Sequence, residues 1–193
     1  MRVAVTGGSG KIGSAVVSEL SAHGHEVINL DQRPPAQLAP GVRFVEVDLA
    51  SRQAVRPVLE QVEAVCHLGE VPNVHVGPTP EAVYGGNARA GAVVLQLAGE
   101  LKLQRVISTS SCQVYGMWEH PRAVPLQLPF DETHPVHPHN AYAAGKAANE
   151  MYAQMIAEMF GTPVVVFRLP WVLPANWTYS EEHVESLRQN GCR

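Results

Sequence analysis

A glycine-rich turn near the amino terminus is the feature that most constrains how this chain folds. Residues 6–13 read Thr-Gly-Gly-Ser-Gly-Lys-Ile-Gly, which places glycines at Gly7, Gly10 and Gly13. A buried-strand pattern at residues 3–5 precedes the turn, and a helical pattern at residues 12–23 follows it. Glycines at this spacing let the backbone bend sharply and approach a pyrophosphate, which the free N–H groups of the helix can bind. The segment predicts a strand, a nucleotide-binding turn and a helix.

Two alternative roles for the turn are less consistent with its sequence. A P-loop needs Ser or Thr directly after its lysine, whereas Lys11 is followed by Ile12. Ordinary turn glycines are the second alternative, and the strand and helix on the correct sides argue against it. We therefore expect the turn glycines, together with Lys11 and Ile12, to contact a nucleotide.

Strand and helix patterns alternate through most of the chain. The apolar spacing predicts strands at 3–5, 25–30, 42–47, 64–68, 105–108 and 164–167, and helices at 12–23, 51–60, 81–101 and 141–160. Nearly continuous apolar strands that alternate with helices are typical of a parallel sheet covered on both faces, so we expect an α/β, Rossmann-like, doubly wound fold. From 112 to 138 the periodicity fails and prolines accumulate, which predicts a loop shaped by function.

Two aspartates follow the second and third predicted strands. Asp31 lies where a carboxylate can accept hydrogen bonds from both hydroxyls of an adenosine ribose and would repel a 2′-phosphate, which favours NAD over NADP. Arg33 complicates this preference, because a guanidinium at that place can hold the phosphate; a solvated surface arginine is the simpler interpretation. Asp48 is a candidate for the adenine edge, with a loop or helix-capping role as an equal alternative.

A tyrosine and a lysine four residues apart are the candidate catalytic pair. Tyr142 and Lys146 lie on one face of the helix expected at 141–160. A tyrosine with a pKa of about 10 is a poor base at neutral pH, and a nearby cation stabilises its phenolate. We expect Lys146 to lower the pKa of Tyr142. Upstream, Ser111 belongs to a hydroxyl-rich segment, 108–116, that follows the fifth strand at the edge where such sheets bind ligands.

Taken in order, these motifs resemble the extended short-chain dehydrogenases/reductases of the NAD-dependent epimerase/dehydratase group. The shared features are Thr-Gly-x-x-Gly-x-x-Gly at 6–13, His-Leu at 67–68, Ser-Ser-x-x-Val-Tyr-Gly at 110–116, Asn-x-x-x-Gly at 87–91 and Tyr-x-x-x-Lys at 142–146. By this resemblance Tyr142 is the acid/base, Lys146 holds the nicotinamide ribose, and Ser111 orients the reacting hydroxyl. The residues expected to contact NAD are Gly7, Gly10, Lys11, Ile12, Gly13, Asp31, Asp48, Leu49, Leu68, Gly69, Asn87, Tyr142 and Lys146.

The chain departs from the family pattern at several places. Gly145 replaces the usual Ser or Thr before the lysine and predicts a locally softer helix, because glycine costs about 1 kcal/mol relative to alanine there. Gly69-Glu70 replaces a small Ala-Ala pair, which leaves Glu70 unexplained. Residues 168–171 lack the usual Tyr-Gly-Pro ending. Family members also continue well beyond Arg193, so we expect an NAD-binding domain at 1–170 and, at 171–193, only the start of a substrate-binding region.

Composition excludes several other classes of function. With a net charge of −4 and scattered Lys and Arg residues, the chain lacks the positive field that nucleic acids or anionic membranes require. Three cysteines without a C-x-x-C pair do not form a disulfide framework, and no apolar segment approaches a membrane span. We expect a cytoplasmic protein. The histidines at 134, 137 and 139 lack the ligand spacing of a metal site, so no metal is expected.

The resemblance implies an NAD-dependent enzyme that acts by hydride transfer at a hydroxyl of a nucleotide sugar or sugar-like substrate. Epimerase, dehydratase and simple sugar or sugar-acid dehydrogenase share this first step. The alternative from another class is a regulatory or truncated protein that holds NAD without turnover. The resemblance also implies a homodimer formed by the helices at 81–101 and 141–160, and we expect the aromatic tail at 171–179 to be mobile or to fold back over the sheet edge.

Overall fold

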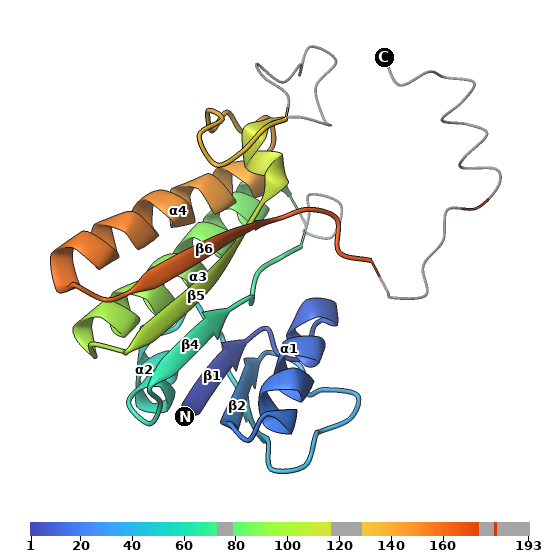
Figure 1. The fold of residues 1–193 in the computed structure, drawn as a ribbon, viewed down its shortest axis with the longest axis vertical. Coiled ribbons are helices and arrows are strands. Elements are labelled where there is room, and N and C mark those ends of the chain that lie inside the picture. Colours follow the sequence, from blue (N-terminus) through green and yellow to red (C-terminus); the bar gives the residue numbers. More distant parts are fainter. Residues whose placement is uncertain (73–78, 117–128, 174–179, 181–193) are drawn as a thin grey trace.

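The computed structural model describes residues 1–72, 79–116, 129–173 and 180. Within them lies a parallel sheet of strand order β3-β2-β1-β4-β5-β6 (Figure 1). The strands are β1 (Arg2–Thr6), β2 (Glu26–Asp31), β3 (Arg43–Glu46), β4 (Ala64–His67), β5 (Arg105–Ser111) and β6 (Val164–Leu169). The helices are α1 (Lys11–Ala22), α2 (Arg52–Leu59), α3 (Pro80–Glu100) and α4 (Ala141–Phe160), with a short 3-10 helix, η1 (Cys112–Tyr115). The predicted Rossmann-like α/β fold is confirmed.

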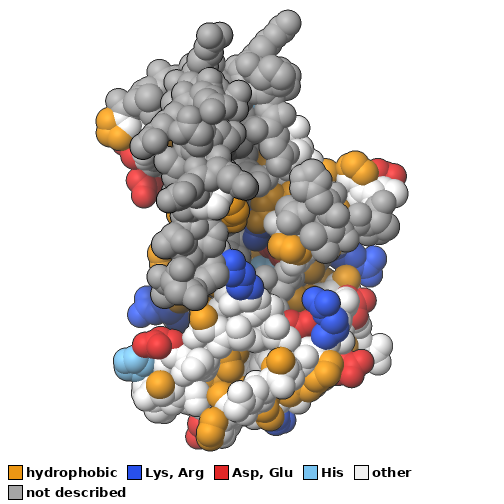
Figure 2. Space-filling model, turned by 90° about the vertical axis from the view of Figure 1, so that its right-hand side faces the viewer, with side chains coloured by type: hydrophobic (Ala, Val, Ile, Leu, Met, Phe, Trp, Pro, Cys, Tyr) orange, Lys and Arg blue, Asp and Glu red, His pale blue; other side chains and the backbone are white. Residues whose placement is uncertain are grey.

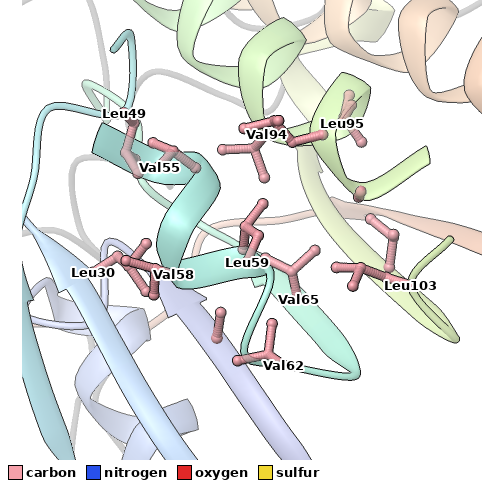
Figure 3. Packing of buried hydrophobic residues seen from close by; sticks show 14 of the residues in the cluster. Leu30, Leu49, Val55, Val58, Leu59, Val62, Val65, Val94, Leu95 and Leu103 are labelled. Atoms are coloured by element: carbon pink, nitrogen blue, oxygen red, sulfur yellow. The ribbon is translucent and has the colours of Figure 1, made fainter. Parts of the chain in front are cut away.

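Each face of the sheet packs against a different set of helices, because successive side chains of a strand point to opposite sides. On β1, Val3 and Val5 pack toward α1, whereas Ala4 packs toward α2, α3 and α4. Figure 3 shows the larger of the two cores, where side chains from α2 and α3 meet those of the central strands. On the α1 side, Val165 and Phe167 of β6 remain 44% and 49% exposed.

The helix ends follow local sequence signals. Ser51, Thr79 and Asn140 cap α2, α3 and α4, and each side chain accepts a hydrogen bond from a backbone N–H of the first turn. Gly161 ends α4 with a φ of +68°, the left-handed conformation that glycine adopts readily. By contrast, the N-cap residue of α1 is Gly10, so no side chain caps this helix. Its first N–H groups are therefore left for another partner.

Two predicted boundaries were wrong at the end of the fifth strand. The pattern predicts a strand at 105–108, but β5 continues to Ser111, because each residue from Ser108 to Ser111 pairs with β6, the last opposite Leu169. The hydroxyl-rich segment is thus partly a strand rather than a loop. Residues 112–115, predicted as irregular, form η1, which Ser111 caps with its own side chain. Parallel pairing overrode the polar composition here.

The strand order reverses between β1 and β4, and the carboxyl ends of these strands meet at one edge. Thr6 at the end of β1 lies opposite His67 at the end of β4. Open α/β sheets bind ligands in the crevice at such a switch point. Figure 2 looks at this side of the molecule, where hydrophobic side chains border a hollow and charged side chains of both signs surround it. In the part of the chain that the structure describes, no helix is long and apolar enough to cross a membrane.

Candidate active site

The turn at residues 6–13, called the glycine turn from here on, is built by backbone contacts. Gly7 has a φ of +68°, and its N–H donates to the carbonyl oxygen of Leu30 at 2.7 Å. The N–H of Gly10 donates to the carbonyl oxygen of Gly7 at 3.0 Å. A Cβ at Gly13 would lie 2.0 Å from that same oxygen. The tight backbone turn and the unpaired N–H groups at the start of α1 form a cradle that fits the pyrophosphate of a dinucleotide.

Lys11 and Ile12 begin α1 directly beside this cradle. Lys11 is exposed, and its Nζ donates to the carbonyl oxygen of Val172 at 3.1 Å, so it links the turn to the segment after β6. Ile12 is half-buried. Both residues lie at the predicted place, and their backbone N–H groups belong to the first helical turn.

Asp31 lies at the end of β2, and its carboxylate is fixed above the glycine turn. Its Oδ2 accepts from the backbone N–H of Ser9 at 3.1 Å, and its Oδ1 accepts from the backbone N–H of Arg33 at 3.2 Å. The side chain is only half-buried, so its remaining lone pairs are open to a ligand. This is the position at which a carboxylate meets the adenosine ribose in dinucleotide-binding folds.

Asp48 and Leu49 follow β3 and have different surroundings. Asp48 is exposed, and its Oδ1 accepts from the backbone N–H of Ala50 at 2.9 Å, which is the loop role left open by the sequence. Ser51, not Asp48, caps α2. Leu49 is buried and lies so close to Gly69 that a Cβ there would be 2.3 Å from Leu49 Cδ1.

A single hydroxyl joins the ends of β1 and β4. The Oγ1 of Thr6 accepts from the backbone N–H groups of Leu68 and Gly69, each at 3.1 Å. It also lies 2.8 Å from Nδ1 of His67. Leu68 and Gly69 are therefore held against the glycine turn, as their predicted place near a cofactor requires.

Asn87, predicted to contact NAD, has both side-chain polar atoms engaged within the protein. Its Oδ1 accepts from the N–H of Val71 at 2.8 Å, and its Nδ2 donates to the carbonyl oxygen of Val71 at 3.0 Å. The side chain is 1% exposed. Asn87 thus fixes the segment that follows β4.

The three predicted catalytic residues come together at the carboxyl ends of β4 and β5. Ser111 ends β5, and its hydroxyl hydrogen-bonds the phenol of Tyr142 in the first turn of α4. Lys146, one turn further along α4, has its Nζ 5.6 Å from the centre of the Tyr142 ring. That Nζ donates to the carbonyl oxygen of Thr109 at 2.7 Å. A hydroxyl, a phenol and an ammonium group therefore share one site, as acid–base chemistry at an alcohol requires.

The expected effect of Lys146 on Tyr142 was wrong for the protein by itself. Burial raises the pKa of Tyr142 to about 12, and the negative charge of Glu70 adds to the rise, while the hydrogen bond with Ser111 opposes it. Lys146 itself forms an ion pair with Glu70 at 2.9 Å. The predicted juxtaposition is present, but the predicted direction of the pKa change is reversed.

Glu70 is the functional residue whose role the sequence left unexplained. Its side chain is 2% exposed, and its Oε2 lies 2.9 Å from Nζ of Lys146. Its Oε1 accepts from Nδ2 of Asn149 at 3.1 Å and lies 3.6 Å from Nε2 of His67. We call His67, Glu70, Lys146 and Asn149 the carboxylate cluster. The spacing of Lys146 and Asn149 on one helix face was the available signal.

The three histidines of the proline-rich segment form ring contacts. The ring of His134 meets the ring of Tyr115 edge to face at 5.3 Å, and the rings of His137 and His139 are 4.7 Å apart. Among the described residues no group of three His, Cys, Asp or Glu side chains is arranged to hold a metal ion.

Comparison with known proteins gives consistent matches over most of the chain. The sequence profile described as "NAD dependent epimerase/dehydratase family" matches residues 3–187. The UDP-glucose 4-epimerase of Mycolicibacterium smegmatis is 31% identical over 171 residues, which cover 83% of this chain and 52% of the relative. The dTDP-glucose 4,6-dehydratase of Streptomyces niveus is 31% identical over 185 residues, which cover 87% of this chain and 53% of the relative.

A solved structure shows the same arrangement. The UDP-glucose 4-epimerase of Thermus thermophilus, solved as a complex with NAD, superposes with a TM-score of 0.77 at 31% sequence identity. The match covers 87% of this chain and 54% of that one. The chain spans about half the length of the curated relatives it matches.

Proposed function

The chain belongs to the NAD-dependent epimerase/dehydratase family, and from that premise we propose that it binds NAD and transfers a hydride at a hydroxyl-bearing carbon of a nucleotide sugar. The observation that carries this proposal is the meeting of Ser111, Tyr142 and Lys146 at the ligand-binding edge of the sheet, beside the glycine turn. The relatives named above act on UDP-glucose and dTDP-glucose, which favours a nucleoside diphosphate sugar as substrate.

Cofactor binding rests on the glycine turn and Asp31. The N–H groups at the start of α1 bind the pyrophosphate, and the carboxylate of Asp31 accepts from the adenosine ribose hydroxyls and repels a 2′-phosphate. We expect Asp31→Ala to reduce the preference for NAD over NADP, measured as the ratio of the two dissociation constants by calorimetry. Equal affinity of the unaltered protein for both cofactors contradicts the assignment.

In the reaction, the side chains of the site would hold the substrate hydroxyl and move its proton. Bound NAD supplies the hydride acceptor. Ser111 orients the substrate hydroxyl, and Tyr142 as phenolate accepts its proton, so that the carbinol becomes a carbonyl as the C–H bond breaks. The ammonium group of Lys146 donates a hydrogen bond to the carbonyl oxygen of Thr109 and pairs with Glu70, and its remaining donor capacity would serve a ribose hydroxyl.

Conversion of the sugar, measured together with NADH formation, across a panel of UDP-sugars, dTDP-glucose and sugar acids tests the proposal, because an epimerase or dehydratase returns the hydride and leaves no net NADH. An NAD titration of the same protein accompanies it. We expect turnover with at least one nucleotide sugar, and loss of turnover without loss of NAD binding in Tyr142→Phe. Turnover with free sugar acids alone would identify a simple dehydrogenase instead.

A second function, NAD binding without turnover, is favoured by one observation. Glu70 pairs with Lys146, and the pKa of Tyr142 lies at about 12, so the base is protonated in the protein by itself. Binding of NAD with no turnover across the whole panel, in the chain extended by any natural continuation, supports this alternative.

The domain organisation and assembly belong to the same proposal. We assign residues 1–170 to NAD binding and 171–193 to the beginning of a substrate-binding region; within the latter, Trp171 is 70% exposed, and most of the predicted aromatic tail lies outside the described residues.

On α4, Met151 and Met159 are 72% and 68% exposed, which suits a homodimer packed through α3 and α4. A light-scattering mass of one chain contradicts the dimer. Free thiols at Cys66 and Cys112 fit a cytoplasmic location.

A further inference from the structure

Glu70 is a buried charge that the reaction described above does not use. It follows β4 directly, and its carboxylate contacts Lys146 and Asn149 of α4. Removing a carboxylate from water is unfavourable unless a cation and hydrogen-bond donors compensate it. Its burial beside a lysine that the reaction needs therefore calls for a functional explanation.

The hydrogen bonds of Thr6 determine the charge state of the neighbouring histidine. The Thr6 hydroxyl accepts from two backbone N–H groups, so its single proton is donated to Nδ1 of His67. His67 must then carry its own proton on Nε2, the nitrogen that faces Glu70. Complete burial lowers the pKa of His67 to about 3, so the ring is neutral at physiological pH. His67 therefore supplies a dipole but no positive charge.

The remaining groups around Glu70 leave Lys146 to balance its charge. Helix α4 contributes Lys146, Tyr142 and the neutral amide of Asn149, and β4 contributes His67. Within the described residues, the cation in contact with Glu70 is Lys146. Its ammonium group donates a hydrogen bond to the carbonyl oxygen of Thr109 and forms an ion pair with Glu70. Burial raises the pKa of Glu70, and Lys146 and Asn149 oppose that rise. The lysine is thus fixed in place and its charge is offset by the carboxylate.

The pKa of the Tyr142 phenol depends on the charges of Glu70 and Lys146. It faces Ser111, Cys112, Glu70 and Lys146, and the negative charge of Glu70 works against its ionisation. A lysine by itself would favour the phenolate, whereas a lysine paired with a buried carboxylate favours it less. The charge that converts Tyr142 into a base must then come from the occupied site.

We propose that Glu70 is a positioning residue that fixes Lys146 and cancels its charge, so that Tyr142 stays a neutral phenol until cofactor and substrate occupy the site. This inference rests on the proposed function in one respect, the assignment of Tyr142 and Lys146 as the acid–base pair. It explains why this chain carries a glutamate at a place where its family usually has a small residue.

A tyrosinate titration of the cofactor-free protein tests the inference. Near-ultraviolet absorbance is followed from about pH 7 to about pH 10, the range below the ordinary tyrosine pKa. Subtracting the matching Tyr142→Phe protein isolates Tyr142. We expect no Tyr142 ionisation in this range in the unaltered protein. In Glu70→Gln the pKa of Tyr142 should fall from about 12 far enough for its ionisation to begin within this range, because one of the causes that raise it is removed and Lys146 is then uncompensated, while burial still raises it.

Two further variants separate charge from packing. Glu70→Asp keeps the negative charge and should keep Tyr142 un-ionised, and Glu158→Gln makes the same chemical change at an exposed place on α4 and should leave the titration unaltered. Far-ultraviolet circular dichroism at each pH verifies that the variants are folded. If Glu70→Gln does not fold, Glu70→Leu replaces the carboxylate with an apolar side chain of similar size and is titrated instead.

An unshifted Tyr142 in a folded Glu70→Gln protein overturns the inference, as does an equal shift in Glu70→Asp. Neither measurement uses NAD or a sugar. The inference can therefore fail in an active enzyme, and it can hold in a protein that never turns over a sugar.

Discussion

The glycine turn and the carboxylate cluster lie at the carboxyl ends of the adjacent strands β1 and β4, but they are built from different chemical groups. The glycine turn uses backbone groups, and its geometry depends on the absence of side chains, since a Cβ at Gly13 would lie 2.0 Å from the carbonyl oxygen of Gly7. The carboxylate cluster uses buried side chains, and its behaviour depends on how one negative and one positive charge balance. A site made of backbone groups tolerates few substitutions, but its geometry depends little on pH. The charge balance of a site made of ionisable side chains changes with pH and with each neighbouring charge.

Removing the cation of the carboxylate cluster should have the largest effect. In Lys146→Met the carboxylate of Glu70 is left buried without its partner, and loss of one member of a buried ion pair costs about 3–5 kcal/mol. We expect the free energy of unfolding in urea at pH 7 to fall by about this amount. The double variant Lys146→Met/Glu70→Gln should regain most of the loss, and equal stability of the single and double variants contradicts the charge argument.

A methyl group in the glycine turn should have the next largest effect. Gly13→Ala forces the backbone apart, which costs about 1–3 kcal/mol by analogy with overpacked cores, and calorimetry should show NAD affinity reduced about tenfold or more. Gly85→Ala is the matched control, because nothing lies within 4 Å of a Cβ at that position of α3. Equal NAD affinity in the two variants would mean that the turn does not form the cradle.

Acid should lower the free energy of unfolding through the carboxylate cluster, by a smaller amount than the changes above. Burial lowers the pKa of His67 from 6.5 to about 3, so the folded state excludes a proton that the unfolded chain binds. The resulting stability is present above pH 6.5 and is lost as the pH falls toward 3, at up to about 1.4 kcal/mol per pH unit. Urea unfolding between these values should show a shallower pH dependence in His67→Gln. An unchanged slope in a folded His67→Gln protein argues against a neutral buried ring.

The smallest expected effect is a gain in stability beside the carboxylate cluster. A Cβ at Gly145 would meet Asn87 Cβ at 3.4 Å, an ordinary contact, so Gly145→Ala should stabilise α4 by up to about 1 kcal/mol. Gly91→Ala, whose Cβ would lie 2.3 Å from the side chain of Asn149, should instead destabilise the protein. Thermal unfolding of both variants gives the comparison. Stabilisation by both would show that helix propensity outweighs packing, and destabilisation by both would contradict the expected gain at Gly145.

The difference between the two regions also explains how far the sequence could predict them. The alternation of strands and helices, the glycine turn and the place of Asp31 follow from local patterns, because apolar periodicity and glycine spacing are read within a few residues. The sequence motifs also predicted that Ser111, Tyr142 and Lys146 share one site, and the structure places them together.

What could not be predicted depends on residues far apart in the chain. Glu70 and Lys146 are separated in the sequence by α3, β5 and the segment before α4, and only their contact reveals that the lysine is already paired. The hydrogen bonds between the side chain of Asn87 and the backbone of Val71 likewise join residues that are well separated in the sequence. The extension of β5 to Ser111 depends on pairing with β6, which lies far later in the chain.

The Thr6 hydroxyl couples the glycine turn to the carboxylate cluster. Thr6 begins the glycine turn, and the same oxygen holds Leu68, Gly69 and the ring of His67, the direct neighbour of Glu70. A ligand that shifts the turn must therefore disturb the partner of the histidine, and a proton gained beside Glu70 must disturb the turn. Linkage makes this exchange reciprocal: the factor by which a nucleotide changes proton affinity at the catalytic end equals the factor by which that proton changes nucleotide affinity.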